Sequence, residues 1–251
     1  MQITAVKTRR LEPPKDDLLR AFAEAVSAIE ERSVIAVASK VVSIWQGRCL
    51  ERGSVEKGTL IAAEAEQYLP RGAVKGWPAI RTKKYGVLGT SAGVDESNGG
   101  GYFVLLPEQP FETAREIRRW VQTEYGVSDV GVIITDSRSH PLRRGSTGVS
   151  LGFYGFKPLR DYRGTVDVFG KGLVSSQANV ADGLAAAAVV AMGEGGESTP
   201  VAVISDPPVV FGEKPLHPTA DHCSFFVEEK DDIFYPYYKD LPWERGIRDR
   251  F

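Results

Sequence analysis

The arrangement of apolar and polar positions along the chain predicts a mixture of buried strands and amphipathic helices. Three short runs are rich in β-branched and other apolar residues, which is typical of strands covered on both faces. They lie at Ser33–Ala38, Gly131–Thr135 and Val201–Ile204. The alternating start, Met1–Lys7, predicts another short strand. We also expect strands at Lys83–Leu88 and Tyr102–Leu106.

Apolar residues at helical spacing predict four helices. The first follows Asp16 or Asp17, either of which can cap it, and its apolar face runs from Leu18 to Ile29. The others are expected at Lys57–Leu69, Phe111–Tyr125 and Ala178–Met192. Because the last of these is rich in alanine, it can pack closely on a sheet.

Length and composition indicate a folded protein with a full hydrophobic core. The chain has 251 residues, of which 42% are apolar, enough for one large domain or two small ones. The net charge of −2 gives no reason to expect nucleic-acid binding. Two cysteines are too few for a disulfide framework, and no apolar run is long enough to cross a bilayer. The start does not resemble a signal peptide, so we expect a cytoplasmic protein without a membrane partner.

The stretch Gly131–Gly145 carries the most informative polar residues. Its apolar run gives way at Asp136 and Ser137 to a polar, basic loop, so we expect a strand that ends there. Asp136 offers a carboxylate of the kind that Mg²⁺ or Mn²⁺ prefers, and Ser137 offers a hydroxyl beside it. Arg143 and Arg144 are suited to clamp phosphate or carboxylate oxygens. The alternative is a strand that ends in an ordinary turn, with both arginines solvated.

A glycine-rich loop, Gly89–Gly101, is the second informative stretch. Its small residues let the backbone approach a ligand closely, and Asp95, Glu96 and Asn98 place oxygen ligands near one another. A hairpin loop with ordinary turns explains the same composition. Ser39 and Lys40, which follow a predicted strand, suit either a phosphate-binding edge or a strand-to-helix turn.

Further charged residues lie in later loops. Asp161 falls in a charged run that either lines a cleft or forms a structural salt-bridge loop, and Glu194 and Glu197 lie in a glycine-rich loop that is more often only flexible. Near the end of the chain, His217, His222 and Cys223 match no standard zinc spacing, so we do not expect zinc there.

The order of these motifs resembles that of the coenzyme F420-0:L-glutamate ligase family. The similarity rests on Ala92–Asn98, Leu105–Pro107, Val132–Ser137 with Pro141 and Arg143, Asp161–Gly164 with Asp167 and Gly170, and Met192–Glu194 ahead of Pro200. It covers residues 1–205, with a looser fit in the N-terminal half. Residues 206–251 form an aromatic extension, which we expect to pack on the body of the protein or on a second subunit.

The resemblance implies an α+β fold with two lobes of mixed sheet and helix, a homodimer, and GTP-dependent amide ligation with Mg²⁺ or Mn²⁺. The first metal's carboxylates would be Asp95 and Asp136, and Ser137 would hold a second metal. The residues expected to contact the nucleotide are Arg9, Arg10, Leu11, Glu12, Ser39, Lys40, Asn98, Glu194 and Glu197. The residues that we expect to be catalytic are Arg143 and Asp161. The substrates would be GTP, L-glutamate and either F420-0 or a folate.

Several residues depart from the family's usual pattern. Ser139, His140 and Leu142 replace a Gly-Arg-Pro-Trp-Arg motif in part, and Ile44 stands where a lysine is common. A nucleotide-binding relative without turnover is therefore an alternative. A metal-dependent phosphohydrolase is a third hypothesis, because Asp95 and Asp136 are suited to position a water molecule.

Overall fold

A computed structural model of the chain describes residues 1–76, 79–212 and 225–247. The histidine and cysteine positions considered for zinc, His217, His222 and Cys223, lie outside these residues. No helix among the described residues is long and apolar enough to cross a membrane. The chain divides into two compact units. Unit 1 comprises Met1–Arg9, Phe22–Ala38 and Gln109–Phe225, and unit 2 comprises Arg10–Ala21, Ser39–Glu108 and Phe226–Phe251.

Unit 1 is built on a five-stranded sheet with the strand order β1-β12-β2-β8-β9. Its strands are β1 (Gln2–Val6), β12 (Val201–Ser205), β2 (Ser33–Ala38), β8 (Val130–Ser139) and β9 (Ser146–Tyr154). Only β2 and β8 run parallel, and the other neighbours are antiparallel. These central strands are continuous apolar runs because they are buried on both faces.

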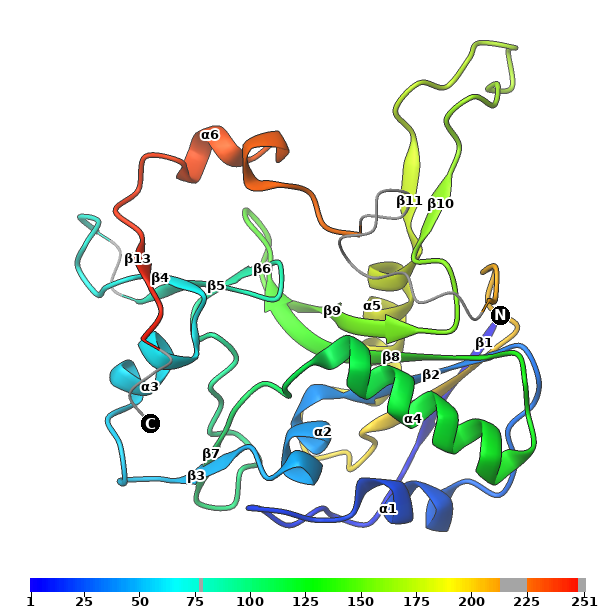
Figure 1. Ribbon diagram of the computed structural model, residues 1–251, viewed down its shortest axis with the longest axis horizontal. Coiled ribbons are helices and arrows are strands. Elements are labelled where there is room, and N and C mark those ends of the chain that lie inside the picture. Colours follow the sequence, from blue (N-terminus) through cyan, green and yellow to red (C-terminus); the bar gives the residue numbers. More distant parts are fainter. Residues whose placement is uncertain (77–78, 213–224, 248–251) are drawn as a thin grey trace. The chain divides into compact units, whose positions relative to one another are not determined.

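Two helices cover the faces of this sheet, α4 (Pro110–Tyr125) on one and α5 (Val180–Met192) on the other (Figure 1). The alanines of α5 pack against Val34, Ile133 and Phe153 in the main core. Gly148 on β9 permits this close approach, since a Cβ there would lie 2.4 Å from the carbonyl oxygen of Ala185. The expected close packing of the alanine-rich helix is therefore confirmed.

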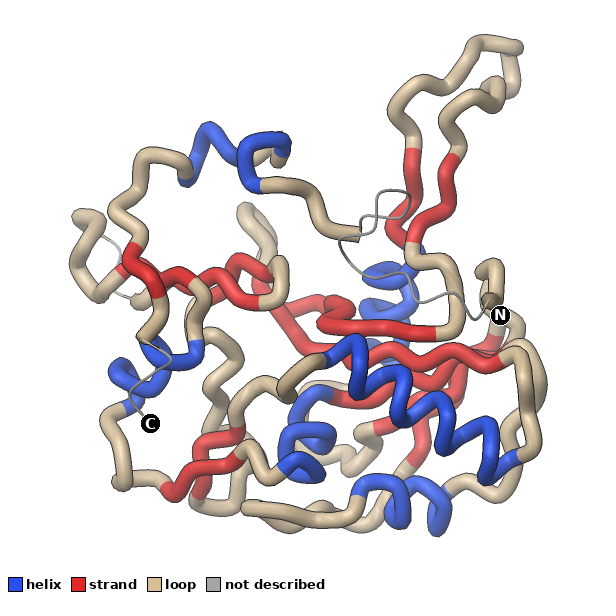
Figure 2. The backbone as a smooth tube through the Cα atoms, viewed as in Figure 1, coloured by secondary structure: helices blue, strands red, loops and turns tan. Residues whose placement is uncertain are grey.

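Unit 1 also carries a two-stranded hairpin, β10 (Leu159–Asp161) and β11 (Gln177–Asn179), with a long connecting loop (Figure 2). Val168 and Phe169 in this loop are 94% and 93% exposed. Val166 and Val174 in the same loop are also exposed, at 64% and 86%, and groups of exposed apolar side chains often mark a contact surface.

Unit 2 contains a four-stranded antiparallel sheet of order β13-β4-β5-β6 and a separate pair, β3 with β7. The strands are β13 (Glu244–Arg245), β4 (Gln67–Leu69), β5 (Arg81–Lys84), β6 (Val87–Gly89), β3 (Cys49–Glu51) and β7 (Tyr102–Val104). The helical elements are α2 (Ser39–Gln46), α3 (Lys57–Glu64), the short 3₁₀ turn η1 (Glu229–Asp231) and α6 (Tyr235–Tyr238). Helix α1 (Leu18–Ala25) begins in unit 2 and ends in unit 1. The mixture of helices with mostly antiparallel sheets confirms the predicted α+β class.

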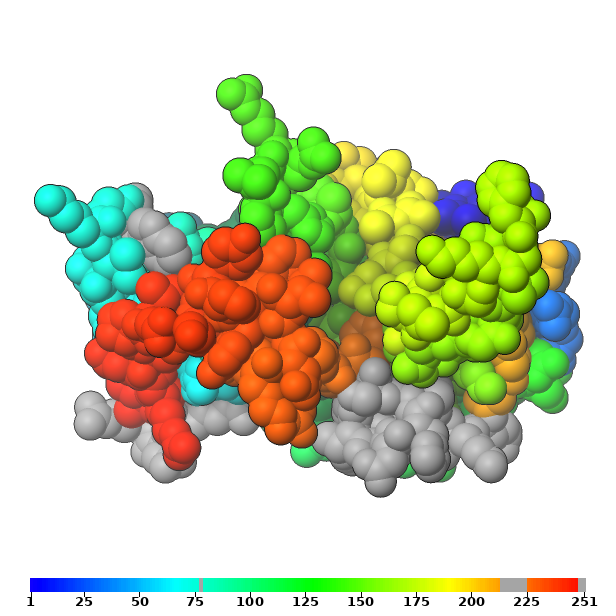
Figure 3. Space-filling model, turned by 90° about the horizontal axis from the view of Figure 1, so that it is seen from above, coloured from blue at the N-terminus to red at the C-terminus, as the bar shows by residue number. Residues whose placement is uncertain are grey.

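The C-terminal segment Phe226–Ile247 belongs to unit 2, and Figure 3 shows much of it in orange and red on the surface. Lys83 on β5 holds it in place. The Lys83 ammonium lies 4.3 Å from the centre of the Trp243 ring and 4.9 Å from that of Tyr238, and it pairs with Glu229 at 2.8 Å. Tyr238 and Trp243 therefore pack on the chain's own sheet, whereas Phe234 and Tyr237 of the same extension are 56% and 81% exposed.

Two predicted elements of unit 2 were wrong in their extent. The helix expected over Lys57–Leu69 ends at Glu64, because Gln67–Leu69 pairs with both β5 and β13 as strand β4. The strand expected over Lys83–Leu88 is a hairpin. Its two turn residues, Tyr85 and Gly86, have φ angles of 51° and 70°, which reverse the chain between β5 and β6.

The central strand of unit 1 also differs from expectation, because β8 does not end at Asp136 but continues to Ser139. Its pairing with β2 stops at Thr135, whereas its pairing with β9 continues to Ser139. Beyond Thr135 the strand is thus part of a two-stranded ribbon, in which Asp136, Ser137 and Arg138 are partly exposed and Ser139 is exposed. The change from apolar to polar residues marks the loss of one neighbour and not the end of the strand.

Candidate functional site

The predicted metal-binding residues fall into two groups, one in each unit, and we describe each group by itself. The unit 2 group surrounds Asp95 in the loop between β6 and β7. The unit 1 group surrounds Asp136 and Ser137 on the two-stranded part of β8.

Asp95 is fixed by its backbone as well as by its side chain. Its N–H donates to the carbonyl oxygen of Val104 at 2.9 Å, and its own carbonyl accepts from the Val104 N–H at 2.8 Å. The Oδ1 atom accepts the N–H of Ser97 at 2.8 Å, and Oδ2 accepts the Ser97 hydroxyl at 2.8 Å. Burial raises the pKa of Asp95, but Lys40 and Ser97 outweigh this effect and the pKa is lowered. The carboxylate is therefore ionised at neutral pH.

Lys40, the second residue of α2, provides the counter-charge for Asp95. Its ammonium donates to Asp95 Oδ2 at 2.8 Å, to the Ser97 carbonyl oxygen at 2.6 Å and to the Ser97 hydroxyl at 2.9 Å. The neighbouring Glu96 is paired separately, with Lys57 at 2.5 Å and Arg52 at 3.0 Å. Asp95 is thus paired with Lys40, and Glu96 is paired with two other cations.

The position of the Asp95 loop is fixed by close packing on Leu106. Gly93 has a φ of +76°, and a Cβ at this position would lie 2.1 Å from Leu106 Cγ. Only glycine allows this contact without a large shift of the backbone. Leu106 is fixed in turn, since its carbonyl oxygen accepts from Arg48 Nε at 3.3 Å. The loop that carries Asp95 is therefore tied to residues in the interior of unit 2.

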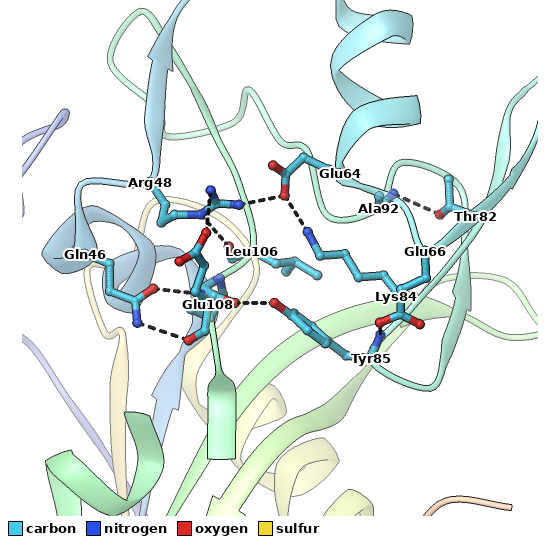
Figure 4. A network of polar contacts seen from close by, with 11 residues as sticks. Gln46, Arg48, Glu64, Glu66, Thr82, Lys84, Tyr85, Ala92, Leu106 and Glu108 are labelled. Atoms are coloured by element: carbon cyan, nitrogen blue, oxygen red, sulfur yellow. Dashed lines mark hydrogen bonds and ion pairs between the residues drawn. The ribbon is translucent and has the colours of Figure 1, made fainter. Parts of the chain in front are cut away.

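Figure 4 shows the polar network that supports this segment. Glu64 Oε2 accepts from Arg48 at 2.7 Å and from Lys84 at 2.5 Å. The Lys84 side chain is only 2% exposed, so it depends on Glu64 for neutralisation. Tyr85 and Gln46 bind the backbone of Pro107 and Glu108. The network therefore joins β5, α3 and the start of β3 to the chain beyond β7.

In unit 1, Ser137 contacts the loop after α5 directly. The Ser137 hydroxyl donates to Glu194 Oε1 at 2.8 Å. Glu197, in the same loop, accepts the N–H of Gly195 at 2.8 Å. Asp136 lies next to Ser137 and pairs with Val149 across the ribbon. The structure thus brings Ser137 and Glu194 together, a pairing that their separation in the sequence does not indicate.

Both groups offer the oxygen atoms that Mg²⁺ or Mn²⁺ prefers. In unit 2, the Asp95 carboxylate and the carbonyl and hydroxyl oxygens of Ser97 bind one cationic group, the Lys40 ammonium. Oxygens of these kinds also bind hard divalent metal ions. In unit 1, the Ser137 hydroxyl and the Glu194 carboxylate form a similar oxygen pair. The donor chemistry therefore fits these metals at each group. In the described part of the chain, no three His, Cys, Asp or Glu residues gather to hold a metal ion.

The two residues predicted to be catalytic lie in exposed parts of unit 1. Arg143 lies in the turn between β8 and β9. Asp161 on β10 is bound by the Arg163 guanidinium through contacts of 2.6 to 3.0 Å. These hydrogen bonds lower the pKa of Asp161 to about 2. Asp161 consequently remains ionised and is a poor proton acceptor near neutral pH.

The remaining predicted nucleotide contacts differ in their exposure. Arg9 pairs with Glu24 at 3.4 Å in unit 1, and Arg10 pairs with Glu12 at 2.7 Å in unit 2. Leu11 is buried, with only 5% of its surface exposed. Ser39 is also buried at the start of α2, whereas Asn98 is exposed with a left-handed φ of 53°.

Sequence reasoning missed Ser97 and the group formed by Glu64, Lys84 and Arg48. The signal for Lys84 was present, because Thr82 and Lys84 alternate with Arg81 and Lys83 on a strand and form its buried face. Ser97 had no comparable signal, because its role depends on the Asx turn that Asp95 makes in the folded loop.

Comparison with known proteins identifies the class of this chain. Residues 6–206 match the family described as F420-0:Gamma-glutamyl ligase. A protein of Methanopyrus kandleri named coenzyme F420:L-glutamate ligase is 36% identical over 218 residues, 81% of this chain and 86% of the relative. Proteins with the same name from Halobacterium salinarum and Methanocaldococcus jannaschii are 35% and 33% identical, over 76% and 73% of this chain and 81% and 79% of their own lengths.

These matches identify the chain as an enzyme of the ligase class. More specifically, the chain belongs to the F420-0:gamma-glutamyl ligase family. The resemblance inferred from the order of the motifs is thereby confirmed. The C-terminal segment after residue 206 lies beyond the matched range.

Proposed function

We propose that this chain forms an amide bond between the amino group of L-glutamate and a carboxylate of F420-0. The observation that carries the proposal is the similarity to three proteins named coenzyme F420:L-glutamate ligase, which extends over most of each chain. The fixed, ionised carboxylate of Asp95, with a cation beside it, is the structural feature that suits such chemistry.

The proposed reaction proceeds through an acyl phosphate. A free carboxylate resists attack by an amine, because its oxygen is a poor leaving group. Transfer of the γ-phosphoryl group of GTP to a carboxylate oxygen yields GDP and an acyl phosphate. The glutamate nitrogen then attacks the carbonyl carbon, phosphate departs with the electron pair of the broken C–O bond, and the nitrogen loses a proton. No protein nucleophile is required.

We assign metal binding to Asp95 in unit 2 and to Asp136 and Ser137 in unit 1. Bound Mg²⁺ or Mn²⁺ would neutralise and align the phosphates. Arg143 would add positive charge for phosphate or carboxylate oxygens. Asp161 would act through its fixed negative charge, because its pKa of about 2 makes it unsuitable as a base.

The nucleotide contacts are proposed at Arg9, Arg10, Leu11, Glu12, Ser39, Lys40, Asn98, Glu194 and Glu197. GTP is the proposed nucleotide. The acceptor is proposed as F420-0, with a folate as the second choice. The departures from the family's pattern lie at Ser139, the last residue of β8, and at His140 and Leu142 in the turn that follows it. A change of acceptor or a loss of turnover would follow from changes at such a turn.

We also propose that the protein is a homodimer in the cytoplasm. Tyr238 and Trp243 of the aromatic extension that first prompted the dimer pack on Lys83 of unit 2, but Val168 and Phe169 in the loop of the β10–β11 hairpin remain exposed. Two large apolar side chains in water favour a partner surface. Light scattering at micromolar concentration should give the mass of a dimer, and the mass of a monomer would contradict this part of the proposal.

The dependence of phosphate release on each substrate tests the reaction class. We expect GTP with Mn²⁺ to release little phosphate until both L-glutamate and the acceptor are present. Release without glutamate would favour a phosphohydrolase. Calorimetry that detects GTP binding while no phosphate forms under any condition would favour a relative without turnover.

A further inference from the structure

The unit 2 group contains a cationic side chain, Lys40, that binds Asp95 directly. All three acceptors within reach of the Lys40 ammonium are oxygens, namely Asp95 Oδ2, the Ser97 carbonyl and the Ser97 hydroxyl, at 2.6 to 2.9 Å. An ammonium group has three N–H donors, so these three contacts satisfy it completely. The same combination of carboxylate, carbonyl and hydroxyl oxygens is a typical ligand set for a hard divalent cation.

We propose that Lys40 is a tethered cation that occupies the cation position at Asp95 and must leave it when a divalent metal ion binds. The proposal rests on the assigned role of Asp95 as a metal ligand. An ammonium and a divalent ion cannot share Asp95 Oδ2 and the Ser97 oxygens, because their positive charges repel each other at such short range. Metal binding in the absence of other ligands is therefore opposed by Lys40.

The departure of Lys40 has a consequence for the nucleotide. Once displaced, the ammonium keeps its charge and its three donors, and it has lost the carboxylate that neutralised it. A polyphosphate that arrives with the metal supplies new oxygen acceptors. Lys40 thus couples the two ligands: it weakens the binding of metal alone and favours the binding of metal together with a phosphate anion. Lysine suits this exchange because its charge is compact and its stem is flexible.

The surrounding charges distinguish Lys40 from its neighbours. Lys57 and Arg52 pair with Glu96, so their positive charge is also close to the loop, yet neither is hydrogen-bonded to Asp95 among the described contacts. If only the total positive charge mattered, the loss of Lys57 would favour metal binding as much as the loss of Lys40. If Lys40 occupies the cation position, only its own removal vacates it.

The test is a titration of the ligand-free protein with Mn²⁺, in which the electron paramagnetic resonance signal reports the free ion. We expect Lys40→Met to bind Mn²⁺ roughly tenfold more tightly than wild type, because one competing charge is removed. Lys40→Gln should behave in the same way, and it retains a polar side chain if the Met variant fails to fold. Lys40→Arg, which keeps the charge, should remain as weak as wild type.

Lys57→Met is the matched control, because it makes the same substitution at a lysine that pairs with the neighbouring carboxylate, Glu96. The proposal is supported if Lys57→Met raises Mn²⁺ affinity clearly less than Lys40→Met does. It is overturned if the two variants raise Mn²⁺ affinity equally. It is also overturned if neither Lys40→Met nor Lys40→Gln raises Mn²⁺ affinity. Asp95→Asn separates this inference from the proposed function. If Asp95→Asn binds Mn²⁺ as wild type does, the assignment of Asp95 as a metal ligand fails. If Asp95→Asn loses Mn²⁺ while the Lys40 variants gain nothing, only the role of Lys40 fails.

Inorganic triphosphate provides a second arm of the same experiment. In wild type, we expect triphosphate to tighten Mn²⁺ binding more than it does in Lys40→Met, after correction for Mn²⁺ bound by triphosphate in solution. An equal gain in both proteins would contradict the coupling through Lys40.

Discussion

Replacing Asp95 or Asp136 by asparagine should lower turnover by at least about a hundredfold, because each change removes a negative charge that we assign to the metal. Mn²⁺ affinity should fall in parallel. The asparagine side chain has nearly the same size, so the fold should persist. Asp95→Asn weakens a partly exposed pair with Lys40, which is worth about 1 kcal/mol or less. Steady-state kinetics and Mn²⁺ titration measure the two effects.

Asp240→Asn is a matched control for these variants. Asp240 is 88% exposed, lies 4.0 Å from Lys239 and falls in the C-terminal segment beyond the range that matches the family. Its replacement should leave turnover and Mn²⁺ affinity unchanged. The metal assignment is wrong if Asp95→Asn and Asp136→Asn both bind Mn²⁺ as tightly as this control does.

Glu64→Gln should strongly destabilise unit 2, with a loss of about 3–5 kcal/mol in the free energy of unfolding. Glu64 neutralises Lys84, which is 2% exposed, and Arg48, which is 22% exposed. Glutamine keeps the shape of the side chain but removes the negative charge beside the buried Lys84, whereas Arg48 keeps its pair with Glu108 at 3.0 Å. Urea denaturation measures the change, and the double variant Glu64→Gln with Lys84→Met should recover part of the loss.

Glu228→Gln is the control for this prediction. Glu228 pairs with Lys230 at 2.9 Å, but both side chains are at least 70% exposed. Water screens such a pair, so the substitution should change stability by no more than about 0.5 kcal/mol. If Glu64→Gln and Glu228→Gln unfold at the same urea concentration, the buried network does not stabilise unit 2 as described.

The Glu64 network should also give stability a defined dependence on pH. Burial raises the pKa of Glu64, but Lys84 and Arg48 outweigh it, so the folded protein holds this pKa below its ordinary value. The stabilisation is therefore complete above the ordinary glutamate pKa and is lost as the pH falls through the lowered value. The stability difference between wild type and Glu64→Gln should shrink in acid. A difference that stays constant from neutral to acidic pH would contradict this account.

The pattern of apolar residues predicted the strands of unit 1 better than it predicted those of unit 2. The apolar runs at Ser33–Ala38 and Val201–Ile204 became β2 and β12, since burial on both faces requires such composition. In unit 2 the strands have only two to four residues, too few for a period to be recognised. Their formation depends on partners distant in the sequence, as Gln67–Leu69 shows by pairing with β5 and β13 instead of extending α3.

The sequence indicated candidate site residues by their type but not which of them contact one another. Asp95, Asp136 and Lys40 were identified because carboxylates and lysine follow strands or small residues in recognisable motifs. That Lys40 would bind Asp95, 55 positions later, and that Ser137 would bind Glu194, 57 positions later, depends on tertiary structure alone. The sequence also did not indicate that the Arg163 guanidinium binds Asp161 and lowers its pKa to about 2, which is why we propose only an electrostatic role for Asp161.

The most direct test of the proposed activity is mass spectrometry of the products. The protein would be incubated with F420-0, L-glutamate, GTP and Mn²⁺, and in a parallel reaction with tetrahydrofolate in place of F420-0. We expect F420-0 to gain at least one glutamyl residue, with one GDP formed for each amide bond. Folded protein that yields no glutamylated product from either acceptor would contradict the proposed ligase activity.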